Sequence, residues 1–342
     1  MPRSSPVLKV TKLPTPMPFD LERVEMITID DVRSAQTKIA SYVTRTPTVP
    51  SRTLSERLGT NIYLKLELFQ KTGSFKPRGV FNRMLRLSDE EKKPGVVGFS
   101  GGNFAQALAY GGRTLGIRTH IFMPEYTPKN YVEATRGYGT ELELTPTLQG
   151  IIEGAERYSR RGWTFIHPYD DPFMMGGHGT LGLELLEDVP ELTDVVVSIG
   201  GGGLMSGVVT AIKSVKPNAR VWGVETEGAD AMARALEAGK VVEIQPTSIA
   251  KTLGAPNVAE DALTIAQQHL ESVTVVPDKE AFEALKFLLE RAKVLAEPAA
   301  SCTLAAAERL RLNFSNDHQV VLILCGGNVS LSDLGEFEKR FG

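Results

Sequence analysis

The sequence predicts an α/β fold in which parallel strands alternate with helices. Short runs rich in Val, Ile and Leu recur along the 342 residues, and segments with the apolar spacing of a helix follow most of them. This alternation is typical of parallel strands joined by right-handed crossovers. Turns rich in glycine follow three of the apolar runs, at 100–103, 200–203 and 325–328. The length suits one large domain or two ordinary ones.

The elements of the N-terminal half begin with a helix near residue 30. Thr28 or Asp30 can cap that helix, and its apolar residues run from Val32 to Val43. Strands are predicted at 62–66, 96–99, 119–123, 141–144 and 164–166. Helices are predicted after the first four strands, at 80–85, 104–112, 128–137 and 149–161.

The C-terminal half continues the alternation. Residues 167–172 are rich in turn-forming residues and mark a candidate domain boundary. Beyond it, strands are predicted at 194–199, 220–225 and 320–324, and helices at 176–186, 204–215, 278–292 and 298–311. Five prolines among the first twenty residues predict an extended arm over 1–20.

Composition excludes several classes of function. The net charge of −3 gives no basic field that would recruit nucleic acid or an anionic membrane. No apolar run is long enough to cross a bilayer, and no signal peptide is recognisable at the N-terminus. The two cysteines, Cys302 and Cys325, define no disulfide framework. We therefore expect a cytoplasmic protein with neither nucleic acid nor a membrane as its partner.

A lysine precedes a proline in the turn after the strand predicted at 62–66. The stretch from Gly73 to Gly79 contains Lys76 followed by Pro77. A residue before proline avoids helical backbone angles, so Lys76 is expected at the very start of the next helix. A lysine fixed there can point into a cleft, whereas a lysine considered alone is more often a solvated surface residue.

Four consecutive glycines, Gly200 to Gly203, separate a predicted buried strand from a helix. Glycine lets backbone N–H groups approach an anion closely, and the helix N-terminus adds partial positive charge, so the loop predicts a phosphate site. A tight structural turn and a dinucleotide fold are the alternatives, and Glu225 ends the next strand where a ribose-binding acid could lie. The glycines are contiguous instead of spaced G-x-G-x-x-G, which counts against the dinucleotide fold.

The order of these motifs resembles a known family. The pyridoxal-phosphate enzymes of the tryptophan synthase β fold, known as fold type II, carry in the same order the motifs Ser74-Phe75-Lys76, Ser100-Gly101-Gly102-Asn103, Gly200–Gly203 and Cys325-Gly326-Gly327-Asn328. The serine/threonine dehydratase and serine racemase branch is the most similar, over residues 27–330. The resemblance implies two open, parallel-rich twisted sheets flanked by helices, with pyridoxal 5′-phosphate between them. It also implies a large domain formed by 21–84 and 167–342, a small domain at 85–166, and a homodimer.

The resemblance also implies roles for single residues at the cofactor. Lys76 would hold the cofactor as a Schiff base and, once released, would take the proton from the substrate Cα. Phe75 would pack against one face of the pyridine ring, and Asn103 would hydrogen-bond the 3′ oxygen. The phosphate would be held by Gly200, Gly201, Gly202 and Gly203, with Leu204 or Met205 at the start of the helix.

Cys325 would lie at the pyridine nitrogen, and a plain core cysteine is the alternative. A thiol, unlike a carboxylate, does not keep the ring nitrogen protonated, so the cofactor would withdraw electrons less strongly. The resemblance therefore favours rapid β-elimination over transamination.

The substrate would contact the loop formed by Ser100, Gly101, Gly102, Asn103 and Phe104. Relatives that racemise serine carry a second serine at the position of Gly101, so racemisation should be poor here. Phe104 replaces a His that many relatives carry, which makes a bulkier 3-hydroxy amino acid conceivable as substrate. Only Glu225 offers a sure carboxylate at the cation site of the racemase branch, so we expect no bound metal.

The resulting hypothesis is a lyase with a small amino acid as its substrate. It would convert an L-3-hydroxy amino acid such as threonine or serine to a 2-keto acid and ammonia by β-elimination. Within the family, the alternatives are a dehydratase of the phenylserine or hydroxyaspartate type, a β-replacement enzyme and an amino acid racemase. Outside it, the alternatives are a NAD-dependent oxidoreductase and a non-catalytic cofactor-binding protein. The remaining polar residues of the 167–178 region are interpreted as structural, namely His167, Asp170, Asp171 and His178.

Overall fold

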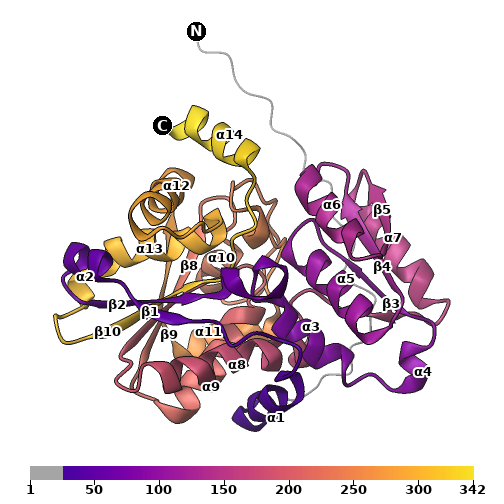
Figure 1. Ribbon diagram of the computed structural model, residues 1–342, viewed down its shortest axis with the longest axis horizontal. Coiled ribbons are helices and arrows are strands. Elements are labelled where there is room, and N and C mark those ends of the chain that lie inside the picture. The colour runs from indigo at the N-terminus through magenta and orange to yellow at the C-terminus, as the bar shows by residue number, and fades with distance from the viewer. Residues whose placement is uncertain (1–25) are drawn as a thin grey trace.

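Two sheets organise the computed structural model, which describes residues 26–342 (Figure 1). The larger sheet has six strands in the order β1-β2-β10-β7-β8-β9, and the smaller sheet has four strands in the order β5-β4-β3-β6. Neighbouring strands are parallel, except that β1 and β2 are antiparallel. This arrangement confirms the predicted α/β class with two parallel-rich sheets.

The bounds of the elements follow the apolar pattern of the sequence. The larger sheet comprises β1 (Thr48–Pro50), β2 (Asn61–Leu66), β7 (Asp194–Ser198), β8 (Arg220–Thr226), β9 (Leu270–Val276) and β10 (Gln319–Leu324). The smaller sheet comprises β3 (Val96–Phe99), β4 (Thr119–Pro124), β5 (Glu141–Thr145) and β6 (Thr164–Phe165), all within the segment 85–166. The helices packed near it are α4 (Asp89–Lys92), α5 (Asn103–Leu115), α6 (Lys129–Gly137) and α7 (Leu148–Ser159).

The other helices are α1 (Ile29–Ile39), α2 (Arg52–Leu58), α3 (Lys76–Met84), α8 (Pro172–Asp188), α9 (Gly203–Val215), α10 (Ala231–Ala238), α11 (Glu260–His269), α12 (Asp278–Phe287), α13 (Pro298–Leu310) and α14 (Leu331–Phe341). Helices α8, α9 and α11 lie on one side of the larger sheet, and α12 and α13 lie on the other (Figure 1). Helix α3 packs against both α8 and α5, so it lies between the two sheets.

The middle strands of the larger sheet are buried on both faces because helices cover both. Residues 195–197 of β7 and 320–324 of β10 have no exposed surface, which explains their continuous Val, Ile and Leu runs. The parallel register pairs Leu324 of β10 with Leu66 of β2. The loops that follow β2, β7 and β10 therefore meet at the carboxyl edge of this sheet, where open α/β sheets bind their ligands.

The structure differs from the predicted elements in several places. The first helix is capped by Thr28, as predicted, but it ends at Ile39 instead of reaching Val43. The helix predicted over 278–292 is α-helical only to Phe287 and continues as a π turn, Leu288–Ala292. Strands β1 and β9 and helices α2, α4, α10, α11 and α14 were not predicted. The arm predicted over 1–20 lies outside the described residues.

Candidate active site

The loop that carries Lys76 is tied to the loop that follows β10. Phe75 donates its backbone N–H to Cys325 O at 3.0 Å, and Gly327 donates its N–H to Gly73 O at 3.0 Å. These bonds join two motifs that are far apart in the sequence. The motif around Lys76 and the motif at 325–328 are therefore neighbours in the fold.

Lys76 is the first residue of α3, as the proline after it predicts. Its Nζ donates a hydrogen bond to Pro168 O at 2.7 Å. The ring centroids of Phe75 and Phe104 lie 5.1 and 6.0 Å from Nζ. Desolvation of the amine lowers the pKa of Lys76 to about 8, although the nearby Cys325 opposes the shift. A substantial fraction of the amine is therefore neutral near physiological pH.

The ring of Phe75 is supported from behind by His178 of α8. The two rings pack edge to face with their centroids 4.7 Å apart. His178 is fully buried, and in the part of the chain that the structure describes neither ring nitrogen has a hydrogen-bond partner. Burial, aided by the charges of Lys76 and Arg78, lowers the pKa of His178 well below its usual value. His178 is therefore a neutral ring in the packing of the site.

The glycine loop between β7 and α9 has no room for side chains. A Cβ on Gly201 would lie 2.2 Å from the ring of Tyr169, and a Cβ on Gly203 would lie 2.8 Å from the Tyr169 carbonyl oxygen. Gly202 has a φ of +95°, which favours glycine. Tyr169, from the segment before α8, therefore requires glycine at 201 and 203, and a Cβ on Gly202 would lie 2.3 Å from Ala262 Cβ.

The backbone amides of this loop are available to a ligand. Residues 201–205 are buried, and among residues 26–342 no acceptor is found for their N–H groups. Unpaired buried N–H groups are rare in proteins, and at the N-terminus of a helix they form an anion site. This loop therefore fits the phosphate of a cofactor, as the glycine run predicts.

Cys325 is buried next to the end of β7. Ser198 Oγ lies 3.4 Å from its Sγ, which in turn lies 3.6 Å from Ala299 O. Burial and the field of Glu297 raise the pKa of Cys325 to about 12. The thiol is therefore neutral, which suits a group placed beside a ring nitrogen that it does not protonate.

Asn103 begins α5 and lies in a buried amide contact. Its Oδ1 accepts a hydrogen bond from Asn328 Nδ2 at 2.7 Å, and its Nδ2 donates to Glu297 Oε1 at 2.8 Å. One of the two amide hydrogens is thus engaged, and the second has no protein acceptor within residues 26–342. The amide can therefore donate to a cofactor oxygen without breaking either bond.

The rest of the predicted substrate loop precedes and follows Asn103. Ser100 Oγ accepts a hydrogen bond from the Gly102 N–H at 3.0 Å, which shapes the turn. A Cβ on Gly101 would lie 3.0 Å from Thr127 Oγ1, a buried hydroxyl that has no partner among the described residues. Phe104 belongs to the core of the smaller sheet, with its ring toward Lys76.

Glu297 is a site residue that the sequence analysis missed. The side chain is buried, and Oε1 accepts hydrogen bonds from Asn103 at 2.8 Å and from Thr252 Oγ1 at 3.0 Å. Tyr131 of α6 lies with its hydroxyl 3.5 Å from Oε2 and donates to Asn328 O. Burial raises the pKa of Glu297 to about 7, although these hydrogen bonds oppose the shift.

The sequence holds only a weak signal for Glu297. An acid followed by Pro298 at the start of a predicted helix indicates an N-terminal residue near a helix dipole. Its partner Asn103 is 194 positions away, so no local pattern connects the two residues.

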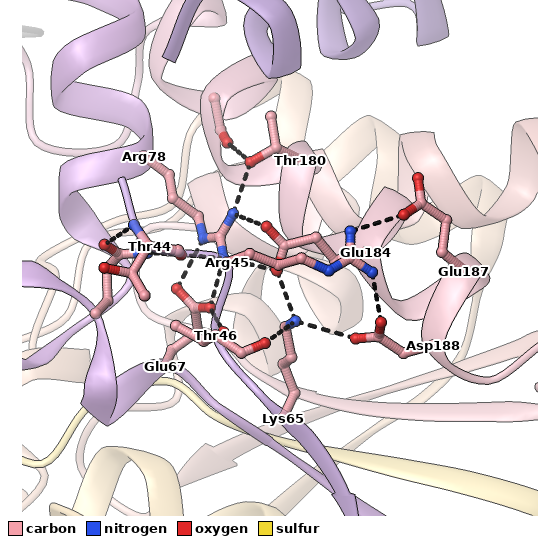
Figure 2. A network of polar contacts seen from close by, with 12 residues as sticks. Thr44, Arg45, Thr46, Lys65, Glu67, Arg78, Thr180, Glu184, Glu187 and Asp188 are labelled. Atoms are coloured by element: carbon pink, nitrogen blue, oxygen red, sulfur yellow. Dashed lines mark hydrogen bonds and ion pairs between the residues drawn. The ribbon is translucent and has the colours of Figure 1, made fainter. Parts of the chain in front are cut away.

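A second buried cluster anchors α3 from the other side (Figure 2). The Arg78 guanidinium donates to both oxygens of Glu67, at 2.8 Å each, and to both oxygens of Glu184, at 2.7 and 2.9 Å. Lys65 of β2 donates to Glu184 at 2.6 Å and to Thr46 O at 2.8 Å. We call Arg78, Lys65, Glu67 and Glu184 the Arg78 cluster.

The Arg78 cluster balances two cations with two carboxylates. All four side chains are buried or nearly so, and burial opposes the charge of Arg78. The carboxylates of Glu67 and Glu184 outweigh burial and raise the pKa of Arg78. Since Arg78 lies two residues after Lys76, the cluster joins the start of α3 to β2 and α8.

Other polar residues serve turns and helix ends. His167 Nδ1 accepts from the backbone N–H of Asp170 at 2.8 Å, and Asp171 caps α8 and pairs with Arg83 at 3.0 Å. Glu225 accepts from two backbone N–H groups at the start of α10, each at 2.8 Å, and burial raises its pKa to about 8. Among residues 26–342 there is no cluster of three His, Cys, Asp or Glu that could hold a metal.

Comparisons with known proteins agree with the fold and the loops. Residues 39–326 match the family described as pyridoxal-phosphate dependent enzyme. The chain is 39% identical over 311 residues to an L-threonine ammonia-lyase of Thermotoga maritima, covering 90% of this chain and 77% of that protein. It is 38% identical over 309 residues to an L-threo-3-hydroxyaspartate ammonia-lyase of Saccharomyces cerevisiae, covering 89% and 94%.

Solved structures agree as well. Maize serine racemase superposes with a TM-score of 0.86 at 34% identity, covering 92% of this chain and 98% of that one. In the described part of the chain, no helix is both long and apolar enough to cross a membrane. The resemblance inferred from the motifs is thus confirmed, and the chain belongs to the pyridoxal-phosphate-dependent enzymes of fold type II, with pyridoxal 5′-phosphate as its cofactor.

Proposed function

We propose that this enzyme eliminates water from an L-3-hydroxy amino acid such as threonine or serine and releases a 2-keto acid and ammonia. The relatives named as threonine ammonia-lyase, threonine dehydratase and hydroxyaspartate ammonia-lyase, at 35–39% identity over most of the chain, support a lyase. The observation that carries the proposal is the amine of Lys76, with a pKa of about 8, placed beside a neutral thiol and an unpaired set of loop amides.

Each of these residues has a chemical task in such a reaction. Bound pyridoxal phosphate accepts the electron pair that remains at the substrate Cα after its proton is removed. Lys76 would hold the cofactor on its amine and, when that amine is free, would take the Cα proton. An amine with a pKa of about 8 suits this task because a useful fraction is neutral at physiological pH.

The surrounding residues would bind and orient the cofactor. The amides of the loop Gly200–Gly203 and of Leu204 would hold the phosphate, and Phe75 would cover one face of the ring. Asn103 would donate to the 3′ oxygen, and Cys325 would lie at the ring nitrogen. A thiol with a pKa of about 12 leaves that nitrogen unprotonated, which favours elimination over transamination.

The loop 100–104 would bind the substrate. Gly101 has no side chain that could protonate Cα from the face opposite Lys76, so elimination is favoured over racemisation. Serine racemases among the structural neighbours keep racemisation as a second candidate, with Gly101 as the observation against it. Two other candidates are a bulkier 3-hydroxy amino acid, which the apolar Phe104 favours, and an acidic one, which the hydroxyaspartate ammonia-lyase of yeast supports.

A keto-acid release assay tests the proposal. Serine, threonine, 3-hydroxyaspartate and phenylserine are supplied as separate diastereomers, with chiral analysis of the remaining substrate. We expect keto acid and ammonia from wild type, and neither product from Lys76→Ala, which should also lose the visible band of the bound cofactor. Release of no keto acid from any substrate would contradict a lyase. Release from serine and threonine alone would show that Phe104 does not select a bulkier substrate.

Three further inferences rest on the family resemblance. We propose a small domain at 85–166 inserted into a large domain formed by 21–84 and 167–342, and the position of the four-stranded sheet supports that division. We also propose a homodimer, which light scattering would test, and a cytoplasmic location.

A further inference from the structure

A chain of hydrogen bonds with a fixed direction runs through Asn103. Asn328 Nδ2 donates both to Thr72 O at 2.8 Å and to Asn103 Oδ1 at 2.7 Å, and Asn103 Nδ2 then donates to Glu297 Oε1 at 2.8 Å. The chain joins the loop before α3, the loop after β10, the start of α5 and the start of α13.

Both ends of this chain are acceptors. The Thr72 carbonyl can only accept, so Asn328 must present its NH₂ group there and to Asn103. An ionised Glu297 can also only accept, so Asn103 must present its own NH₂ group to the carboxylate. The orientation of the Asn103 amide therefore follows from its two neighbours. If Glu297 were absent, nothing on that side would oppose rotation of the amide, which would exchange its oxygen and nitrogen.

Glu297 is an unusual side chain for a purely structural role. It is buried, and among residues 26–342 it has no cationic partner; it faces Asn103, Thr252 and Tyr131 instead. Burial of a carboxyl group away from any cation is unfavourable, and a glutamine of the same size would avoid that penalty. A carboxylate is better than an amide in one respect, because both of its oxygens accept and neither end can donate to Asn103.

We propose that Glu297 is a positioning residue for the cofactor, acting through Asn103. It fixes the amide so that the free N–H of Asn103, and not its oxygen, is available to an electron-rich oxygen on the cofactor. This inference rests on the proposed function only in assigning Asn103 to the 3′ oxygen. Losing Glu297 leaves Asn328 alone to hold this orientation, so the Asn103 amide is positioned less firmly toward the cofactor oxygen.

The test compares Glu297→Ala and Glu297→Gln in the full chain. Pyridoxal phosphate is titrated into cofactor-free protein while the visible band is followed, and the band position of the saturated enzyme is recorded. We expect Glu297→Ala to raise the dissociation constant about tenfold or more, the loss expected for one hydrogen bond to a charged group, and to shift the band. Glu297→Gln should cause a smaller rise, because its amide oxygen can still accept from Asn103.

Asp194→Asn is the matched control. Asp194 is an equally buried acid at the opposite end of the same sheet, where it bonds Trp222 and Arg220. Its conversion to an amide should lower the melting temperature without shifting the band. If Glu297→Ala does not fold, the isosteric Glu297→Gln still has to raise the dissociation constant and shift the band.

A double-mutant cycle separates positioning from general destabilisation. In an Asn103→Ala background, Glu297→Gln should change the dissociation constant less than twofold and should not shift the band. The reason is that the amide through which Glu297 acts on the cofactor is missing. Equal effects in both backgrounds, an unchanged band in both Glu297 variants, or no effect of Asn103→Ala on the cofactor would each overturn the proposal. Failure of wild type to release keto acid would overturn the lyase function alone, because none of these measurements uses turnover.

Discussion

The protein contains two buried polar clusters, one around Arg78 and one around Glu297, and they are built on opposite principles. The Arg78 cluster matches two cations with two carboxylates, and every Arg78 nitrogen has a partner (Figure 2). The cluster around Glu297 surrounds one carboxylate with the neutral donors of Asn103, Thr252 and Tyr131. The charges of the Arg78 cluster are balanced within it, whereas Glu297 has no cationic partner in the described part of the chain.

The difference indicates a division of labour. A closed ion network holds backbone elements together, and its charges largely cancel at a distance. An unpaired buried acid acts on its surroundings instead: burial raises the pKa of Cys325, and the field of Glu297 raises it further. We therefore expect changes in the Arg78 cluster to affect stability first, and changes around Glu297 to affect the cofactor first.

The largest expected effect is on the closed cluster. Arg78→Met would leave Glu67 and Glu184 buried without their main partner, so the free energy of unfolding should fall by about 3–5 kcal/mol. Denaturant unfolding of the cofactor-free chain measures it. Arg52→Met is the control, because the exposed pair of Arg52 with Glu56 should contribute about 0.5 kcal/mol or less. Equal losses in the two variants would show that the Arg78 cluster does not carry stability.

The next effect concerns the unpaired acid and depends on pH. The folded-state pKa of Glu297, about 7, lies above its ordinary value of 4.5, so between these values the folded chain holds a proton that the unfolded chain has released. Stability relative to Glu297→Gln should therefore fall as pH rises from 4.5 to 7, by at most about 3 kcal/mol. The facing groups Tyr131, Cys302 and Cys325 do not titrate in this range, because burial raises the pKa of each.

Unfolding curves of wild type and Glu297→Gln at several pH values give this difference directly. A constant difference from pH 4.5 to 7 would mean that folding does not raise the pKa of Glu297. The contrast between the two clusters would then be one of geometry alone.

A third effect belongs to Lys76. Because desolvation lowers its pKa to about 8, the rate at which cofactor-free protein takes up pyridoxal phosphate should fall about tenfold for each pH unit below 8. Stopped-flow absorbance measures this rate. A rate that stays constant from pH 6 to 8 would show that the amine is already neutral there. Lys279→Ala, which removes an exposed lysine paired with Glu283 on α12, should leave the profile unchanged.

The smallest expected effect is at the edge of the Glu297 cluster. Thr252→Val keeps the shape of the side chain but removes the second donor to Glu297 Oε1. The dissociation constant of the cofactor should rise about twofold to fivefold, the range for one neutral hydrogen bond. A rise larger than that of Glu297→Ala would mean that Thr252 contacts the cofactor itself and does not act through the acid.

The parts of the molecule that sequence analysis found are those with local patterns. Parallel strands buried on both faces have continuous apolar runs in the sequence. The four consecutive glycines Gly200–Gly203 likewise predict an anion site from the sequence alone. Lys76 was located because a proline follows it, and its chemistry was inferred from the order of the other motifs. Strand β9 was missed because it is a half-exposed edge strand with polar residues in its run.

The two clusters could not be predicted in the same way. Arg78 meets Glu184 across 106 positions and Asn103 meets Glu297 across 194, so each contact exists only after both sheets have formed. A buried Glu in a printed sequence also looks the same as a solvated one. Whether a carboxylate is buried and whether it has a cationic partner are properties of the fold.

The unpaired amides of residues 201–205 also affect the stability of the cofactor-free protein. Buried N–H groups without acceptors destabilise the cofactor-free fold, and an anion that fills the loop removes that penalty. Ligand that binds only the native state shifts the folding equilibrium in proportion to its concentration relative to its dissociation constant. The amount of folded enzyme should therefore follow the supply of pyridoxal phosphate, so a vitamin-starved cell would lose this protein to proteolysis as well as its activity.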